Sequence, residues 1–163
     1  MGGSIAIDVA KKYSSFKEVS KQIKSILNVE KRKKYNEINT QKKFFVNCKK
    51  NKILLVNLLK KLKRKNKVVY GYGASTKGNV ILQYCKIKDN LINKIVEINK
   101  FKYNRYTPGT KIKIISESEA KSMYPDYYLV LPWHFKKSIL KREKFFLKKG
   151  GKMIFPLPNI QII

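Results

Sequence analysis

The residues best suited to chemistry lie in one short stretch, where glycines, small hydroxyl residues and a lysine follow an apolar run. Gly71 and Gly73 would let the backbone turn sharply and approach a ligand closely. Ser75 and Thr76 can cap a helix or hydrogen bond to phosphate oxygens, and Lys77 adds a positive charge. Because a strand, a tight turn and a helix start together bind phosphate in many proteins, this stretch predicts an anion site.

The glycine pattern is incomplete as a nucleotide fingerprint. A dinucleotide motif would place its third glycine at Thr76, and Gly78 comes two residues later. A Walker loop would need glycine, lysine and then serine or threonine in that order. A glycine turn that only packs a helix against a sheet therefore explains the stretch about as well as a phosphate site does.

An acid, an indole and an imidazole follow later predicted strands. Glu97 ends the second strand, about 20–26 residues beyond the glycine turn, where related folds place an acid on a ribose hydroxyl. Trp133 could stack on a base or sugar ring, or simply pack at the sheet rim. His134 could bind a phosphate or act as an acid or base, or make a hydrogen bond at a helix start.

The elements that must position these residues alternate between strand and helix. We predict strands at 67–72, 94–98, 111–115, 127–131 and 153–155, with helices after Lys77, from a Ser116 cap, and over 134–148. This order predicts an α/β fold, a Rossmann-like parallel sheet of about five strands with helices on both faces. Three polar segments should then converge at the carboxyl ends of the strands: 71–79, 97–99 and 133–134.

The first 66 residues carry a different pattern. Residues 2–10 alternate loosely and predict a strand, residues 15–27 an amphipathic helix, and residues 29–65 one long helix or two in series. The interpretation is that residues 1–66 pack on the core formed by 67–163, giving one compact domain. The alternative is that the long helix binds a partner.

Net charge, hydropathy and cysteine content limit the classes of protein to which the chain can belong. Thirty-eight basic and 10 acidic residues give a net charge of +28, which suggests nucleic-acid binding. Lysine far outnumbers arginine and is spread along the chain, so we interpret the charge mostly as solvated surface that would also attract anions. No run is long enough for a membrane helix. Cys48 and Cys85 are interpreted as reduced core thiols, which together with the absence of a signal peptide predicts a cytoplasmic protein. The chain has no Cys-x-x-Cys pair and a single histidine, so no metal site is expected.

Several segments, taken in order, resemble the C-terminal domain of the nucleotide-sugar C-methyltransferases, which use S-adenosylmethionine. The resemblance covers nearly the whole chain and is carried by 71–79 with Leu82, Tyr84 and Cys85, then 105–110, 131–135, 150–152 and 2–4. The chain departs from the family pattern at Glu97, where aspartate is usual, and at Tyr103-Asn104, where the family has glutamine and glycine.

The resemblance implies that this chain holds a nucleotide-diphosphate sugar. The glycine turn and Lys77 would take the diphosphate, Glu97 the ribose, and Trp133 and His134 the sugar side. The resemblance also implies that zinc-binding and methyl-donor domains lie outside this chain, so that methyl transfer by the chain alone is not expected and the donor is bound elsewhere, on a separate domain or subunit. His134 is the one weak catalytic candidate. The expected substrate-binding residues are Gly71, Gly73, Ala74, Ser75, Thr76, Lys77, Gly78, Asn79, Glu97, Asn99, Tyr106, Pro108, Gly109, Trp133 and His134.

Two other functions remain open from the residues alone. The first is a basic nucleic-acid-binding protein on a Rossmann-like scaffold, whose affinity would fall steeply with salt. The second is a dinucleotide-dependent oxidoreductase, which the incomplete glycine pattern disfavours. The sequence leaves open whether the chain is a fragment, a subunit or a relic that retains binding.

Overall fold

The computed structural model describes residues 6–16 and 20–163. Contacts divide the chain into two units, residues 1–49 and residues 50–163. The first unit holds helix α1 (Ser20–Arg32), which has no buried side chain, and the beginning of helix α2 (Ile38–Arg64). The second unit holds the rest of α2 and every buried apolar residue of the described chain.

The N-terminal predictions are only partly confirmed. Two helices in series are present, and the chain leaves helical geometry between them, where Lys34 has a φ of 56°. Residues 6–10 form no strand, so the strand predicted over residues 2–10 is wrong there, and residues 2–5 lie outside the described residues. Alternating apolar residues favour a strand only where a neighbouring strand can pair with the backbone.

The second unit is built on a six-stranded sheet with the order β3-β2-β1-β4-β5-β6. The first five strands pair in parallel, and β6 pairs antiparallel to β5. The Rossmann-like sheet that the sequence predicts is therefore confirmed, with one additional edge strand. The strands are β1 (Val69–Tyr72), β2 (Lys94–Glu97), β3 (Lys113–Ser116), β4 (Tyr127–Val130), β5 (Lys152–Phe155) and β6 (Gln161–Ile162).

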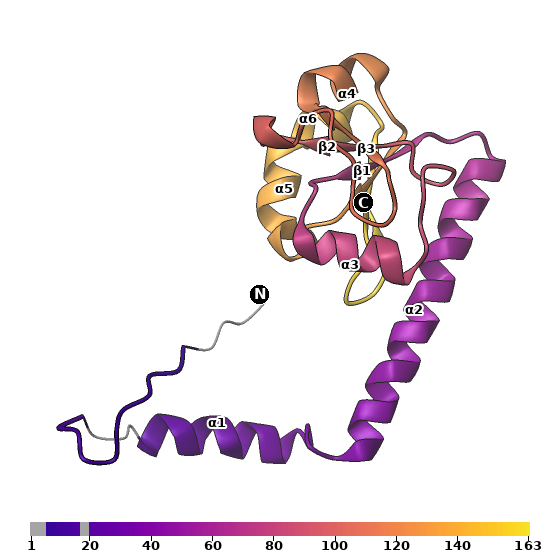
Figure 1. Ribbon diagram of the computed structural model, residues 1–163. Coiled ribbons are helices and arrows are strands. Elements are labelled where there is room, and N and C mark those ends of the chain that lie inside the picture. Colours follow the sequence, from indigo (N-terminus) through magenta and orange to yellow (C-terminus); the bar gives the residue numbers. More distant parts are fainter. Residues whose placement is uncertain (1–5, 17–19) are drawn as a thin grey trace. The chain divides into compact units, whose positions relative to one another are not determined.

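Helices cover both faces of this sheet (Figure 1). Alternate strand residues point to opposite faces, so that Val69 joins one apolar cluster and Tyr70 joins the other. The first cluster includes Leu55, Leu59 and Leu62 of α2 with Leu82 of α3 (Thr76–Tyr84). The second includes side chains from α4 (Glu117–Met123), α5 (Lys136–Arg142) and α6 (Lys144–Lys148).

The apolar side chains of α2 differ in burial along the helix. Toward its C-terminal end, Leu55, Leu59 and Leu62 are buried in the first apolar cluster. Phe44 and Phe45, in the first unit, are 70% and 53% exposed. Cys85 lies in the core, where burial raises the pKa of its thiol, whereas Cys48 is only half-buried.

Serine hydroxyls fix the starts of two helices that follow strands. Ser75 Oγ accepts a hydrogen bond from the Gly78 backbone N–H at 3.0 Å. Ser116 Oγ accepts one from the Glu119 N–H at 3.1 Å, which confirms the predicted cap. The helix predicted over 134–148 is instead a short 3₁₀ turn, η2 (Trp133–Phe135), followed by α5 and α6. No helix in the described part of the chain is long and apolar enough to cross a bilayer.

Candidate functional site

Two cavities flank the turn that joins β1 to α3. Strand order brings the carboxyl ends of β2, β1 and β4 side by side, which is where open parallel sheets bind ligands. We name the cavities after residues found in only one of them. The Glu117 cavity, about 330 Å³, is lined by Tyr72, Gly73, Ala74, Ser75, Val96, Glu97, Ile98, Lys102, Glu117, Pro132, Phe135, Ser138, Ile139 and Arg142. The Arg105 cavity, about 310 Å³, is lined by Ala74, Ser75, Thr76, Asn79, Leu82, Lys102, Arg105, Tyr106, Thr107, Pro108, Ile114 and Leu131.

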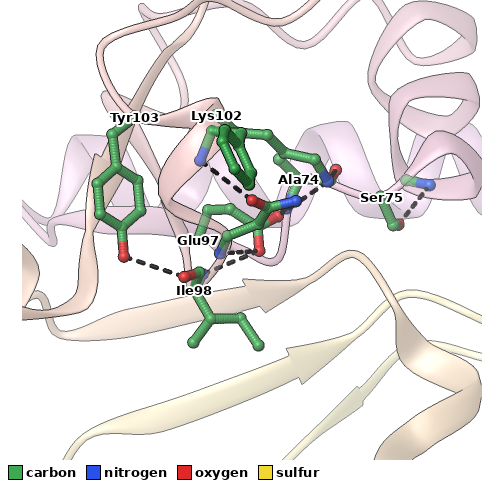
Figure 2. Close-up of polar contacts among 9 residues, drawn as sticks. Ala74, Ser75, Glu97, Ile98, Lys102 and Tyr103 are labelled. Carbon is green, nitrogen blue, oxygen red and sulfur yellow. Dashed lines mark hydrogen bonds and ion pairs between the residues drawn. The ribbon is translucent and has the colours of Figure 1, made fainter.

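The Glu97 carboxylate is the central polar group of this corner (Figure 2). One of its oxygens accepts hydrogen bonds from the backbone N–H groups of Ile98 at 2.8 Å and Asn99 at 3.1 Å. The other accepts from the Ala74 N–H at 2.9 Å and the Lys102 ammonium at 3.3 Å. A carboxylate has about four acceptor positions, so these four donors occupy its capacity.

These contacts explain the charge state of Glu97. Burial alone would raise the pKa of this side chain, which is 8% exposed. The backbone N–H of Asn99, the positive charge of Lys102 and the N–H groups of Ile98 and Ala74 together outweigh burial, and they lower the pKa of Glu97 below its usual range. The carboxylate is therefore ionised at neutral pH and holds the turn after β1 against the end of β2.

Four backbone amides of the glycine turn are already hydrogen-bonded. The Gly73 N–H donates to the Val96 carbonyl at 2.7 Å, and the Ser75 N–H donates to the Gly73 carbonyl at 2.8 Å. The Ala74 N–H donates to Glu97, and the Gly78 N–H to the hydroxyl of Ser75. A phosphate would have to displace an existing acceptor at each of these four groups.

Paired charges line the Glu117 cavity. Arg142 forms an ion pair with Glu117 and lies 3.6 Å from a carboxylate oxygen of Glu143. The Tyr72 hydroxyl donates to Glu143 at 2.8 Å, and burial followed by this hydrogen bond raises the pKa of Tyr72. With Ser138, these groups offer both donors and acceptors beside the apolar side chains of the cavity, an arrangement suited to hydroxyl-rich ligands.

The Arg105 cavity is formed on one side by a loop that is fixed to β3. The Ile114 N–H donates to the Arg105 carbonyl at 2.8 Å, and the Thr107 N–H donates to the Ile112 carbonyl at 3.0 Å. The Thr107 and Thr110 hydroxyls are buried and lie 2.7 Å apart. These bonds fix the loop backbone, including the Cα of Arg105, relative to β3.

About half of the predicted binding residues lie at these cavities. Glu97 and Gly73 line the Glu117 cavity, and Ala74 and Ser75 line both. The Arg105 cavity adds Thr76, Asn79, Tyr106 and Pro108. The remaining predicted residues line neither cavity: Gly71, Lys77, Gly78, Asn99, Gly109, Trp133 and His134.

The indole and imidazole lie on the 3₁₀ turn η2, outside both cavities. Trp133 packs on that cluster, which matches the alternative of packing at the sheet rim. The His134 ring lies 4.3 Å from the ring of Phe135, and its Nδ1 is buried without a partner among the described residues. Desolvation, and then the charge of Lys77, lower the pKa of His134, so that the imidazole is neutral at pH 7. The roles predicted for these two side chains stay predictions.

Sequence reasoning missed four charged residues that line the cavities: Lys102, Arg105, Glu117 and Arg142. Because lysines are spread along the whole chain, the sequence gives no reason to select Lys102 as a binding residue. Arg105 could have been found, because it directly precedes the glycine- and proline-containing turn at 106–110. Within residues 6–16 and 20–163, no group of three or more metal-ligating side chains is close enough to hold an ion.

Comparison with known proteins identifies the family of this chain. The sequence profile of a family described as "C-methyltransferase C-terminal domain" matches residues 1–158. The chain is also similar to the C-methyltransferase NovU of Streptomyces niveus, with 38% identity over 97 residues. That match covers 60% of this chain and 23% of the relative, so the chain corresponds to a minor part of the relative's length.

Proposed function

This chain belongs to the C-methyltransferase C-terminal domain family, and from that premise we propose that it is the substrate-binding part of a sugar C-methyltransferase. In this proposal it holds a nucleotide-diphosphate sugar while a separate domain or subunit supplies the methyl group. The observation that carries the proposal is the pair of cavities that share Ala74, Ser75 and Lys102 at the carboxyl ends of the strands. Each volume is in the range of small-molecule sites.

The chemistry of the two cavities suits the two kinds of group in such a substrate. The Arg105 cavity has cations and hydroxyls, which suit a diphosphate. The Glu117 cavity combines ion-paired carboxylates and a serine with apolar side chains, which suits the hydroxyls and ring face of a sugar. Because the cavities meet at the β1–α3 turn, one extended ligand can occupy both.

The methyl donor used by the family, S-adenosylmethionine, is not assigned to this chain. Its sulfonium is positively charged, and the Arg105 cavity is lined by Lys102 and Arg105 without an acidic residue. This cavity therefore fits an anionic substrate better than a cationic donor. When bound on its own domain, the donor would supply an electrophilic methyl group, and this chain would hold the acceptor sugar in position.

Titration calorimetry of the full chain with a thymidine- or uridine-diphosphate hexose tests the proposal. We expect saturable binding of one ligand per chain. Ser138→Trp should abolish it, because Ser138 is exposed and lines the Glu117 cavity, where an indole would occupy the space of the sugar. Ser122→Trp, at an exposed serine of α4 that lines neither cavity, should bind like the wild type. Absence of binding by the wild-type protein at millimolar ligand would refute the proposed function.

A further inference from the structure

The two cavities differ in the charge that a phosphate would meet. Lys102 and Arg105 line the Arg105 cavity, and none of its lining residues is acidic. Glu97 and Glu117 line the other cavity, where they pair with Lys102 and Arg142 respectively. A doubly charged phosphate group is therefore attracted by the first cavity and meets two carboxylates in the second.

Four backbone N–H groups at the turn are already hydrogen-bonded and are therefore less available to a phosphate. The N–H groups of Gly73, Ala74, Ser75 and Gly78 already have acceptors within 3.0 Å. One of those acceptors is the ionised Glu97 carboxylate, which repels a second anion at the same place. Lys77 is exposed and lines neither cavity.

Arg105 is available for a ligand. Its side chain is exposed, and it forms no ion pair with any carboxylate in the described part of the chain. Its backbone is held on β3, so the side chain extends from a fixed point of the loop beside the cavity. A guanidinium can donate two parallel hydrogen bonds to one phosphate group, which an ammonium cannot do.

Asn79 provides a second sign of a missing ligand in the same cavity. Its side-chain oxygen is buried and has no hydrogen-bond partner among the described residues. A buried acceptor without a donor costs free energy, and a ligand N–H or O–H would satisfy it. The nucleoside of a nucleotide sugar carries such donors next to its phosphates.

We infer that the Arg105 cavity is the diphosphate subsite of this protein, with the Arg105 guanidinium on the phosphates and the Asn79 side chain on a donor group of the adjoining nucleoside. The inference rests on the proposed function and deepens it. It moves the phosphates from the glycine-turn amides and Lys77 to the loop that follows β2.

Calorimetry with thymidine, thymidine monophosphate and thymidine diphosphate separates the phosphate contribution from the rest. The affinity of the wild-type protein should increase with each added phosphate. Arg105→Ala should reduce the affinity for thymidine diphosphate by about tenfold or more, the typical contribution of a charge-assisted hydrogen bond. In this variant the three ligands should therefore differ less in affinity. Arg105→Lys should restore part of the loss. Arg64→Ala, which removes an exposed arginine that lines neither cavity, controls for net charge and should stay within about twofold.

The outcomes distinguish the inference from the function on which it rests. Wild-type binding with equal affinity in Arg105→Ala and Arg64→Ala would overturn the inference and leave the proposed function standing. So would a larger loss in Lys77→Ala than in Arg105→Ala. Failure of the wild-type protein to bind any diphosphate sugar would overturn both. Asn79→Leu should weaken nucleotide binding without lowering the unfolding midpoint, because it removes an unpaired buried acceptor.

Discussion

Glu97 shows what single residues do at this corner. A carboxylate at the end of the second strand could be predicted from sequence spacing alone. Its partners could not, because the reach of a side chain depends on how closely the β1–α3 turn approaches β2. Glutamate is long enough to accept the Ala74 N–H and the Lys102 ammonium together with two amides of its own strand end. The ribose contact predicted for Glu97 would require one of these four donors to leave.

Replacing Glu97 by glutamine should destabilise the fold. The glutamine amide nitrogen would face two hydrogen-bond donors, so we expect a loss of about 1–3 kcal/mol in the free energy of unfolding at pH 7. Because the pKa of Glu97 is lowered in the folded protein, its stabilisation is complete above the ordinary glutamate pKa and disappears as the pH falls through the lower folded value. Urea unfolding from pH 7 to pH 3 should therefore show the wild-type advantage shrinking in acid.

Glu37→Gln is the matched control for this measurement, because Glu37 is exposed and its carboxylate pairs only with Lys34 among the described residues. Its effect should stay within about 0.5 kcal/mol at every pH. If Glu97→Gln behaved like Glu37→Gln, the four hydrogen bonds at Glu97 would not be stabilising the turn.

At the scale of elements, the sequence predicts the parallel core well. Each of the five strands is a short apolar run bounded by glycine, proline or polar residues, and each lies within about two residues of its predicted limits. The sequence does not locate the break between α1 and α2, because residues 33–37 contain no glycine or proline. Lys34 takes a left-handed conformation there, which is uncommon for lysine. Strand β6 was missed because two residues after a proline-rich turn carry no periodicity.

Close packing of α3 on the sheet depends on Gly78. A Cβ built there would lie 2.4 Å from Leu131 Cβ and 2.9 Å from Ser75 Oγ. Gly78→Ala should therefore shift the helix and lower the free energy of unfolding by about 1–3 kcal/mol, even though alanine favours helices. Denaturant unfolding beside Val80→Ala, at a 64% exposed position of the same helix, provides the comparison. Equal stability of the two variants would show that α3 does not need this close approach.

The candidate site was only partly predictable at this scale. Parallel topology dictates that segments after β1, β2 and β4 share one edge, and the contact between Glu97 and Ala74 confirms that the first two meet. Pro132, after β4, also lines the Glu117 cavity. The sequence could not tell that Trp133 would pack on the second apolar cluster, because the direction of a side chain after a strand depends on the backbone of the following 3₁₀ turn.

At the scale of the whole molecule, the net charge of +28 is the feature that most favours the alternative function of nucleic-acid binding. Any chain of this charge attracts nucleic acid, and such binding releases counterions. We expect filter-binding affinity for an oligonucleotide to fall by about a thousandfold between 50 and 200 mM salt, as for proteins with several phosphate contacts. Affinity for a diphosphate sugar should fall far less, because one ligand carries few charges. Tight oligonucleotide binding that survives 200 mM salt would favour a nucleic-acid-binding protein instead.

Lys102 lines both cavities and donates to both the Glu97 carboxylate and the Ala74 carbonyl. A group entering either cavity therefore perturbs the same ammonium that the other cavity uses. Thermodynamic linkage makes such an effect reciprocal: whatever factor a bound phosphate applies to sugar affinity, a bound sugar applies to phosphate affinity. If the two cavities hold the two halves of the proposed substrate, a nucleoside diphosphate and a free hexose added together would report the sign and size of this coupling.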